Sequence, residues 1–235
     1  MKTLNVSPSL TDQVYRAIVD EILEGHLLPG QHLVQEQLAT DLGVSRQPIQ
    51  QAMALLKADG MVEDVGRRGL RVASLDLSRM RCHYDIRGLL DGYAARGAAD
   101  VIRSGAIDTG KIKQQLDEIF EGRTKAIQSQ SVKDQIHYDE SFHKLIYDYS
   151  GNSVLRGTIE PHWRYMRLVM REVLMHAEPA TVVWDQHQLI ADAVLSGDAE
   201  SAGKLAEDHV RTATRRLTEA MERKGAALQK QTSVA

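Results

Sequence analysis

Apolar residues recur at every fourth position near the start of the chain and predict a helix over residues 9–25. The positions are Leu10, Val14, Ile18 and Ile22. Two shorter helical patterns follow over residues 35–41 and 45–59, and two short β-like runs lie at residues 61–65 and 70–74. Three helices followed by a two-stranded hairpin is the order of elements in a winged helix-turn-helix, whose recognition helix enters the DNA major groove.

From residue 76 onwards the pattern is helical throughout. We expect six helices, separated by breaks that mostly contain glycine, over residues 76–103, 109–127, 131–149, 153–175, 180–196 and 199–224. The predicted fold is therefore mainly α, with a winged helix-turn-helix over residues 1–75 and an all-helical domain over residues 76–225. The polar residues 226–235 are expected to form a disordered tail.

The composition is that of an ordinary globular protein, since 43% of its 235 residues are hydrophobic and 26% are charged. No apolar run approaches the roughly 18–20 residues needed to cross a bilayer, and residues 1–10 lack the apolar segment of a signal peptide. The single cysteine, Cys82, excludes an internal disulfide and a cysteine-rich zinc site. We therefore expect a cytoplasmic protein that makes no membrane contact.

The net charge of −3 means that any contact with nucleic acid must rest on locally placed charge. Residues 43–72 carry more basic side chains (Arg46, Lys57, Arg67, Arg68 and Arg71) than acidic ones (Asp59, Glu63 and Asp64). Arginine can pair with guanine, and glutamine with adenine, through two hydrogen bonds. The candidate DNA-contacting residues lie on the two shorter helices and at the hairpin tip: Gln37, Ser45, Arg46, Gln47, Gln50, Arg67, Arg68 and Gly69.

Several motifs follow one another in this half of the chain: Leu28-Pro29-Gly30, Leu42-Gly43-Val44-Ser45-Arg46-x-Pro48-Ile49, and Asp59-Gly60-Met61-Val62 before a Gly-Arg wing. Together they strongly resemble the N-terminal domain of the GntR family of bacterial regulators. The resemblance implies a DNA-binding transcriptional regulator. The chain departs from the family at Gln50-Gln51, where Arg-Glu is usual, and at Gln37, where Arg is frequent. These departures put the common family operator sequence in doubt. They favour recognition of adenine bases and a larger contribution of the wing to DNA contacts.

The strongest chemical signal in the second half is one aspartate and three histidines. Asp139 and His143 lie four residues apart on one predicted helix, so they share a face and can bind one ion. His187 lies on a later helix and His209 on the last, which would place three helices around one point. One carboxylate and three imidazoles suit Zn²⁺, with Ni²⁺ or Mn²⁺ as alternatives.

These ligands belong to a longer series of motifs: Tyr84-x-x-Arg87, Asp139-x-x-Phe142-His143, Gly151-Asn152, Gln186-His187-x-x-Ile190 and Ala206-x-x-His209. The series resembles the FCD ligand-binding domain of the FadR-like branch of the GntR family, over residues 79–225. The resemblance implies an all-helical antiparallel bundle whose divalent transition metal is held by Asp139, His143, His187 and His209. The family usually has an acid just before the third ligand, where this chain has Gln186.

Sensors of this family generally bind small carboxylates or sugar acids beside the metal. A carboxylate can replace a metal-bound water while an arginine pairs with its other oxygen. Arg87 matches the family's arginine on the first helix of the bundle, and Arg164 and Arg171 lie along one side of the fourth helix. These three are the candidate effector-binding residues, and ordinary surface charge is the alternative for each.

The sequence thus predicts a sequence-specific DNA-binding regulator, a repressor more readily than an activator, and not an enzyme. A winged helix reads only a short half-site, so we expect a homodimer on a palindromic operator. Two alternatives stay open. A metal-dependent hydrolase could use such a site to activate water, although the chain has no His-Asp dipeptide and no His-Glu-x-x-His motif. A purely structural metal would sense no ligand.

Overall fold

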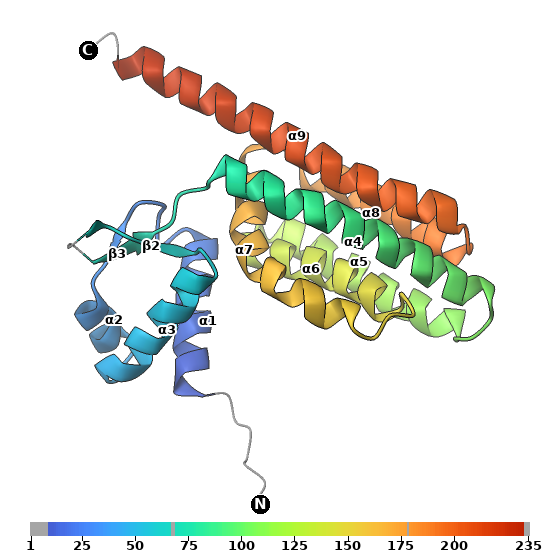
Figure 1. Ribbon diagram of the computed structural model, residues 1–235, viewed down its shortest axis with the longest axis horizontal. Helices are drawn as coiled ribbons and strands as arrows, with labels where there is room; N and C mark the ends of the chain where they lie inside the picture. Colours follow the sequence, from blue (N-terminus) through green and yellow to red (C-terminus); the bar gives the residue numbers. More distant parts are fainter. Residues whose placement is uncertain (1–8, 67–68, 178, 233–235) are drawn as a thin grey trace, which may run out of the picture. The chain divides into compact units, whose positions relative to one another are not determined.

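The computed structural model describes residues 9–66, 69–177 and 179–232 (Figure 1). The chain divides into two compact units, Met1–Leu75 and Asp76–Ala235. Each unit is described by itself. No helix within the described ranges is both long and apolar enough to cross a membrane.

In its described residues the first unit contains the three predicted helices and a small antiparallel sheet that includes the predicted hairpin. Its elements are α1 (Leu10–Glu24), β1 (His32–Leu33), α2 (Gln35–Asp41), α3 (Arg46–Ala58), β2 (Val62–Asp64) and β3 (Leu70–Val72). The sheet has the order β1-β3-β2, and β2 pairs with β3 in the register Val62 to Val72 and Asp64 to Leu70. The third strand, β1, is an addition to the predicted hairpin, because two residues are too few to show a periodic pattern.

The apolar positions that predicted these helices form the core of the first unit. Val14, Ile18 and Ile22 of α1 are buried, as are Ile49 and Met53 of α3, and the two helices pack against each other. Ser9 caps α1 through a reciprocal pair of hydrogen bonds with Asp12, the capping-box arrangement that satisfies free N–H groups of the first turn.

The second unit is wholly helical in the described residues (Figure 1). Its helices are α4 (Leu77–Arg103), α5 (Thr109–Gln128), α6 (Val132–Asp148), α7 (Leu155–His176), α8 (Ala180–Leu195) and α9 (Ala199–Thr232). Helices α4 and α9 lie side by side and make the most extensive helix pair of the unit. Glycine allows their close approach, since a Cβ on Gly92 would lie 2.5 Å from Cγ of Glu207 and one on Gly203 would lie 2.4 Å from Cγ of Arg96.

The last helix corrects one expectation. Residues 226–232, which the sequence predicts as a disordered tail, continue α9 to Thr232, and residues 233–235 lie outside the described residues. The cause is local propensity, because alanine, leucine, lysine and glutamine after Gly225 are strong helix formers and no proline interrupts them. A single glycine costs such a helix only about 1 kcal/mol.

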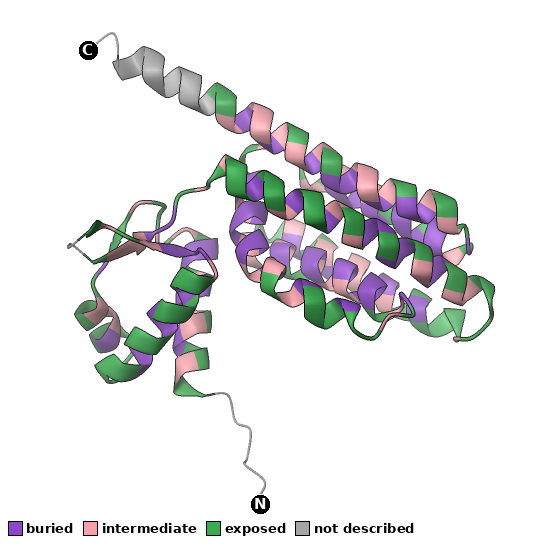
Figure 2. Cartoon of the chain, viewed as in Figure 1, coloured by how far each residue is buried: buried purple, intermediate pink, exposed green. Residues whose placement is uncertain are grey.

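Buried residues, purple in Figure 2, line the inward faces of the helices in the second unit. Most are apolar, but nine of the buried residues that the structure describes in this unit are polar or charged. Six of these come from four different helices: Arg87, Asp91, Asp139, His143, His187 and His209. Buried charges are stable only when they are paired or bind a metal, so this cluster marks the candidate site.

Candidate metal centre

The structure brings the four predicted metal ligands together. Asp139 and His143 lie one turn apart on α6, His187 lies on α8 and His209 on α9, and all four are buried. Each histidine offers a ring nitrogen within 4.8 Å of those of the other two. Nε2 of His187 lies 3.3 Å from Nε2 of His209 and 3.6 Å from Oδ1 of Asp139. Oδ2 of Asp139 lies 3.7 Å from Nε2 of His143.

This donor set fits a divalent transition metal. Imidazole nitrogens bind zinc at about 2.0–2.1 Å and carboxylate oxygens at about 2.0–2.2 Å, so neighbouring donors around one ion are roughly 3–3.5 Å apart. The separations between Asp139, His187 and His209 are close to that spacing. Small side-chain rotations would therefore bring the donors to bonding distance of a shared ion.

His143 is oriented by an aspartate that the sequence analysis did not single out. Nδ1 of His143 lies 3.2 Å from Oδ2 of Asp91 on α4. A carboxylate only accepts hydrogen bonds, so Nδ1 carries the proton and the lone pair of Nε2 is directed toward the metal position. Tyr147 donates a hydrogen bond to the other carboxylate oxygen of Asp91. One indication of this role lay in the sequence: Asp91 follows Arg87 by four residues on the same helix, which places the two side chains on one face.

His209 is oriented in a similar way from α8. Oε1 of Gln186 accepts a hydrogen bond from Nδ1 of His209 at 2.7 Å, which directs Nε2 of that ring toward His187. The glutamine at the position where the family usually has an acid thus contacts a candidate metal ligand. On His187 itself, Nδ1 is buried with no hydrogen-bond partner among the described residues.

Arg87 enters the centre from α4. Its Nη2 donates to Nε2 of His143 at 2.7 Å and lies 4.0 Å from Oδ2 of Asp139, while Nε donates to Oδ2 of Asp91 at 3.2 Å. A neutral imidazole has one acceptor nitrogen, so a metal ion bound to Nε2 of His143 would replace this hydrogen bond from Arg87. The guanidinium also lies over the ring of Trp163, 4.7 Å from its centroid. Burial alone would lower the pKa of Arg87, but Asp91 and its other neighbours raise that pKa above its usual value. The side chain is a permanent buried cation at the edge of the candidate metal site.

Burial keeps two of the candidate ligands in the metal-binding form. It lowers the pKa values of His187 and His209 well below 6.5, with neighbouring histidines adding to the effect, so both rings are neutral at pH 7 as metal ligands must be. Burial raises the pKa of Asp139. For Asp91, burial opposes ionisation, but His143 and Arg87 lower the pKa to about 2.

A small cavity of about 30 Å³ adjoins the centre. Arg87, Asp139 and His209 provide polar groups at its wall, and the remainder of the lining is mostly apolar, with Trp184 and three α7 residues among it. The α7 residues are Met170, Val173 and Leu174.

Of the three candidate effector arginines, only Arg87 is among the described residues that line this cavity. Arg164 and Arg171 are not. Nη1 of Arg171 instead donates to Oε1 of Glu172 at 2.8 Å. Arg171 follows Met170 directly, and neighbouring positions on a helix point about 100° apart, so an arginine there is directed away from the face that lines the cavity.

The candidate DNA-contacting residues lie in the first unit. Gln37, Ser45, Arg46, Gln47, Gln50 and Gly69 are all exposed. Ser45 precedes α3 at its N-cap position without a side-chain capping bond. Arg46 forms an ion pair with Glu36, and Gln37 donates to Asp41 at 2.7 Å. Gly69 has a φ of +103°, and Arg67 and Arg68 lie outside the described residues.

Three helices with a two-stranded wing, and an exposed arginine and glutamines at the start of α3, define the class of DNA-binding transcriptional regulators. Residues 10–72 match the bacterial regulatory proteins of the gntR family, and residues 83–212 match the FCD domain. The chain therefore belongs to the GntR family of regulators and carries an FCD domain.

Individual relatives agree with this assignment. The HTH-type transcriptional repressor RspR of Escherichia coli K12 is 24% identical over 207 residues, 88% of each chain. The HTH-type transcriptional regulator YdhC of Bacillus subtilis is 31% identical over 149 residues, 63% of this chain and 64% of the relative. A solved GntR regulator from Rhodococcus sp. RHA1 has a TM-score of 0.73 at 20% identity, covering 89% of this chain and 98% of its own. The last similarity concerns the fold alone.

Proposed function

We propose that this regulator is a repressor whose operator affinity is controlled by a small organic acid bound beside a metal ion in the FCD domain. The observation that carries the proposal is the position of Arg87. Its guanidinium reaches within 2.7 Å of a metal-facing nitrogen of His143 and lines the same cavity as Asp139 and His209. An acid at this place could contact a metal with one oxygen and an arginine with the other.

The charge of the site supports an anionic ligand. With neutral imidazoles, Arg87 contributes one positive charge, and Asp91 and Asp139 together contribute two negative charges. A divalent ion makes the sum positive by one unit, which a single carboxylate would neutralise. Because an uncompensated buried charge is costly, the metal-loaded centre favours an anion over a neutral molecule. At about 30 Å³ the cavity holds only one or two waters, so an acid with few carbon atoms would need the least movement of its wall.

Asp139, His143, His187 and His209 would hold the metal, with Zn²⁺ the best fit to their chemistry and Ni²⁺ or Mn²⁺ as alternatives. When bound, the ion supplies a Lewis-acidic position for a carboxylate oxygen. Arg87 would orient that carboxylate, and the apolar wall around Trp184 would exclude water from it.

DNA recognition is assigned to the first unit, with Arg46, Gln47 and Gln50 of α3 reading base edges. Gln37, Ser45 and the wing, which includes Arg67, Arg68 and Gly69, would contact phosphates or neighbouring bases. We propose a homodimer on a palindromic operator, because one winged helix reads only a short half-site. The name of the relative RspR, a transcriptional repressor, favours repression over activation.

The site offers little support for a metal-dependent hydrolase. Such an enzyme needs a free carboxylate or similar base to activate water. Among the described acids at the centre, Asp139 is a proposed ligand and Asp91 is already paired with His143 and Arg87. Glu140, next to Asp139 in the chain, is held by Arg167 through two hydrogen bonds of 2.8 and 2.9 Å.

Isothermal titration calorimetry with a panel of di- and hydroxy-acids tests the proposal. We expect at least one acid to bind the metal-loaded protein, and this binding to weaken strongly after chelation or in the Arg87→Lys variant, which keeps the charge but loses the planar fork. Arg171→Lys is the matched control and should bind as the native chain does. Acid binding that depends on neither the metal nor Arg87 would rule out this site. A metal that raises the melting temperature of a protein that binds none of the acids would favour a purely structural ion.

A further inference from the structure

A glutamate of α2 contacts the arginine that opens the recognition helix. Nη2 of Arg46, the first residue of α3, donates to Oε1 of Glu36, which lies in the first turn of α2. Both side chains are exposed, at 68% for Arg46 and 72% for Glu36. Glu36 lies ten residues before Arg46 in the chain, so the turn between α2 and α3 brings the two side chains together.

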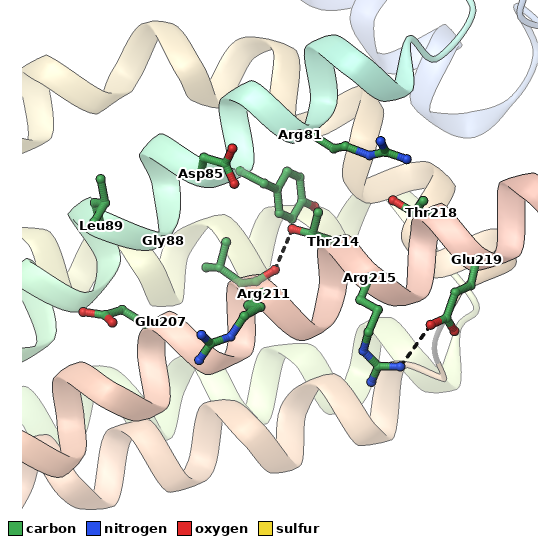
Figure 3. A pocket seen from close by; sticks show the side chains of 12 residues that line it. Arg81, Asp85, Gly88, Leu89, Glu207, Arg211, Thr214, Arg215, Thr218 and Glu219 are labelled. Carbon is green, nitrogen blue, oxygen red and sulfur yellow. Dashed lines mark hydrogen bonds and ion pairs between the residues drawn. The ribbon is translucent and has the colours of Figure 1, made fainter.

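This ion pair differs from the ordinary ion pair of a helical surface. Figure 3 shows the ordinary case beside the groove between α4 and α9, where Arg215 donates to Glu219 one turn further along α9, at 3.1 Å. Two side chains four residues apart on one helix meet because of helix geometry alone. The contact between Glu36 and Arg46 depends instead on how α2 and α3 pack against each other.

Both side chains keep hydrogen-bonding capacity after they have paired. The guanidinium of Arg46 has five N–H donors, and its one hydrogen bond within the described residues goes to Glu36. A carboxylate accepts hydrogen bonds on both of its oxygens, and in the described part of the chain only Oε1 of Glu36 has a donor. The pair can therefore contact a further molecule without breaking.

The position of Glu36 places its carboxylate at the DNA-reading surface. In a helix-turn-helix the N-terminal residues of the recognition helix contact base edges in the major groove, and Glu36 touches the guanidinium of such a residue. An acid in the first turn also stabilises α2 through the helix dipole, but that role requires no contact with Arg46. A carboxylate on this surface repels phosphates of every sequence alike, so it favours DNA binding only where a base donates to it.

The base edges determine which sequence fits the pair. Arginine forms two hydrogen bonds with O6 and N7 of guanine, and a carboxylate accepts a hydrogen bond from the N4 amino group of cytosine. Both groups are presented in the major groove by a G·C base pair. The donors that Arg46 keeps free suit guanine, and Oε2 of Glu36 suits the amino group of a cytosine in the same or the next base pair.

We propose that Glu36 is a specificity-determining residue that reads a cytosine beside the guanine read by Arg46. This inference rests on the base-reading role of Arg46 in the proposed function, and it adds a residue of α2 to the DNA-reading surface. The ion pair holds the carboxylate and the guanidinium in one geometry, so the two contacts form together. A base pair that lacks either the guanine acceptors or the cytosine amino group leaves one charged group of the pair without a partner in the groove.

Selection of duplexes from a random pool tests this role. Fluorescence anisotropy then measures the affinity for the selected duplex and for versions in which each base pair is replaced in turn. Arg46→Ala identifies the guanine position, because its preference for guanine should be lost there. Within one base pair of that position, we expect the native chain to prefer cytosine by roughly 10-fold. Glu36→Ala should lose this preference, and Glu36→Gln should prefer adenine, because glutamine pairs with N6 and N7 of adenine.

Glu21→Ala is the matched control. Glu21 is also an exposed acid in an ion pair of the first unit, 3.1 Å from Nδ1 of His26, and its removal should leave every base preference as in the native chain. The Glu36 variants should keep the native circular dichroism spectrum, because an exposed ion pair contributes little to stability. If Glu36→Ala does not fold, the change from cytosine to adenine in Glu36→Gln decides the question by itself.

The outcomes separate this inference from the regulatory proposal. Native base preferences in both Glu36 variants would overturn the inference and leave the proposed control by an acid intact. Base selection that depends on Glu36, in a protein whose operator affinity responds to no acid, would refute that control alone. A native chain that selects no sequence, or an Arg46→Ala variant that keeps every preference, would remove both Arg46 and Glu36 from the DNA-reading surface.

Discussion

Nδ1 of His143 lies 3.2 Å from Oδ2 of Asp91, which joins a metal-ligand candidate on α6 to a carboxylate on α4. Because Arg87 donates to the same carboxylate oxygen from one turn earlier, Asp91 positions both the histidine and the arginine. The orientation of the proposed metal site and that of the proposed acid-binding group therefore depend on one side chain.

Replacing Asp91 with asparagine should weaken metal binding by about 10–100-fold, the usual effect of losing a carboxylate that orients a histidine ligand. The amide removes the negative charge that holds the proton on Nδ1 of His143. Competition with a chromophoric chelator measures the affinity. Asp85→Asn, an exposed position on the same helix, is the control. Equal affinities in the two variants would show that Asp91 does not support the metal site.

His209→Gln should abolish stoichiometric metal binding, because it removes one of four donors while nearly preserving side-chain volume. His137→Gln should not, since His137 is exposed and is not part of the histidine cluster. Elemental analysis after dialysis measures the metal content, and thermal unfolding reports the stabilisation. At a metal concentration 100 times the dissociation constant, the native chain should gain about 2.7 kcal/mol. Full occupancy in His209→Gln would remove that residue from the ligand set.

The metal-free protein should lose stability as the pH falls below about 6.5. Burial lowers the pKa values of His187 and His209 in the folded chain, so the unfolded chain takes up protons first and acid favours it. Each histidine contributes up to about 1.4 kcal/mol per pH unit in this window. Urea unfolding at several pH values between 7.5 and 5.5 gives the free energy of unfolding as a function of pH. This free energy should fall less steeply with decreasing pH in His209→Gln than in His137→Gln. An identical pH dependence in the two variants would mean that His209 is not a buried neutral histidine.

Arg46→Ala should weaken operator binding by roughly 1–3 kcal/mol, the range for an arginine that pairs with a base. Its guanidinium is exposed and held only by Glu36 of the neighbouring helix, and a surface ion pair of this kind is easily exchanged. Lys57→Ala is the control, because Lys57 lies at the other end of α3 in an ion pair with Asp64. A fluorescence-anisotropy titration at fixed salt separates the two variants, and equal losses would mean that α3 does not read bases through its N-terminal turn.

The helices of the fold were predictable because their apolar residues repeat at helical spacing and glycines separate them. The boundary of α9 was not, since a run such as Ala226-Ala227-Leu228 can continue a helix or fray, and only small differences in propensity decide between the two. Strand β1 was missed for a related reason, because His32–Leu33 is defined by pairing with β3 rather than by its own pattern.

For the metal centre, Asp139 and His143 could be paired from their spacing on one helix. His187 and His209 had to be brought in by their separate motifs, because their meeting depends on how α8 and α9 pack. Asp91 was overlooked for the same reason, since nothing in the spacing within α4 shows which residue of α6 it faces. The direction of each side chain on its packed helix decides which arginine reaches the cavity beside the candidate metal centre. Arg87 lines this cavity and Arg171 does not.

The most direct test of the account measures the operator affinity of the native protein with and without metal, over a range of concentrations of the acid selected by calorimetry. We predict that the acid weakens operator binding by about 5–150-fold, a coupling of roughly 1–3 kcal/mol. This effect should require the metal, should be lost in Arg87→Lys and should persist in Arg171→Lys. An unchanged operator affinity, or an equal response in the chelated protein and in Arg87→Lys, would contradict the claim that an acid beside the metal controls DNA binding.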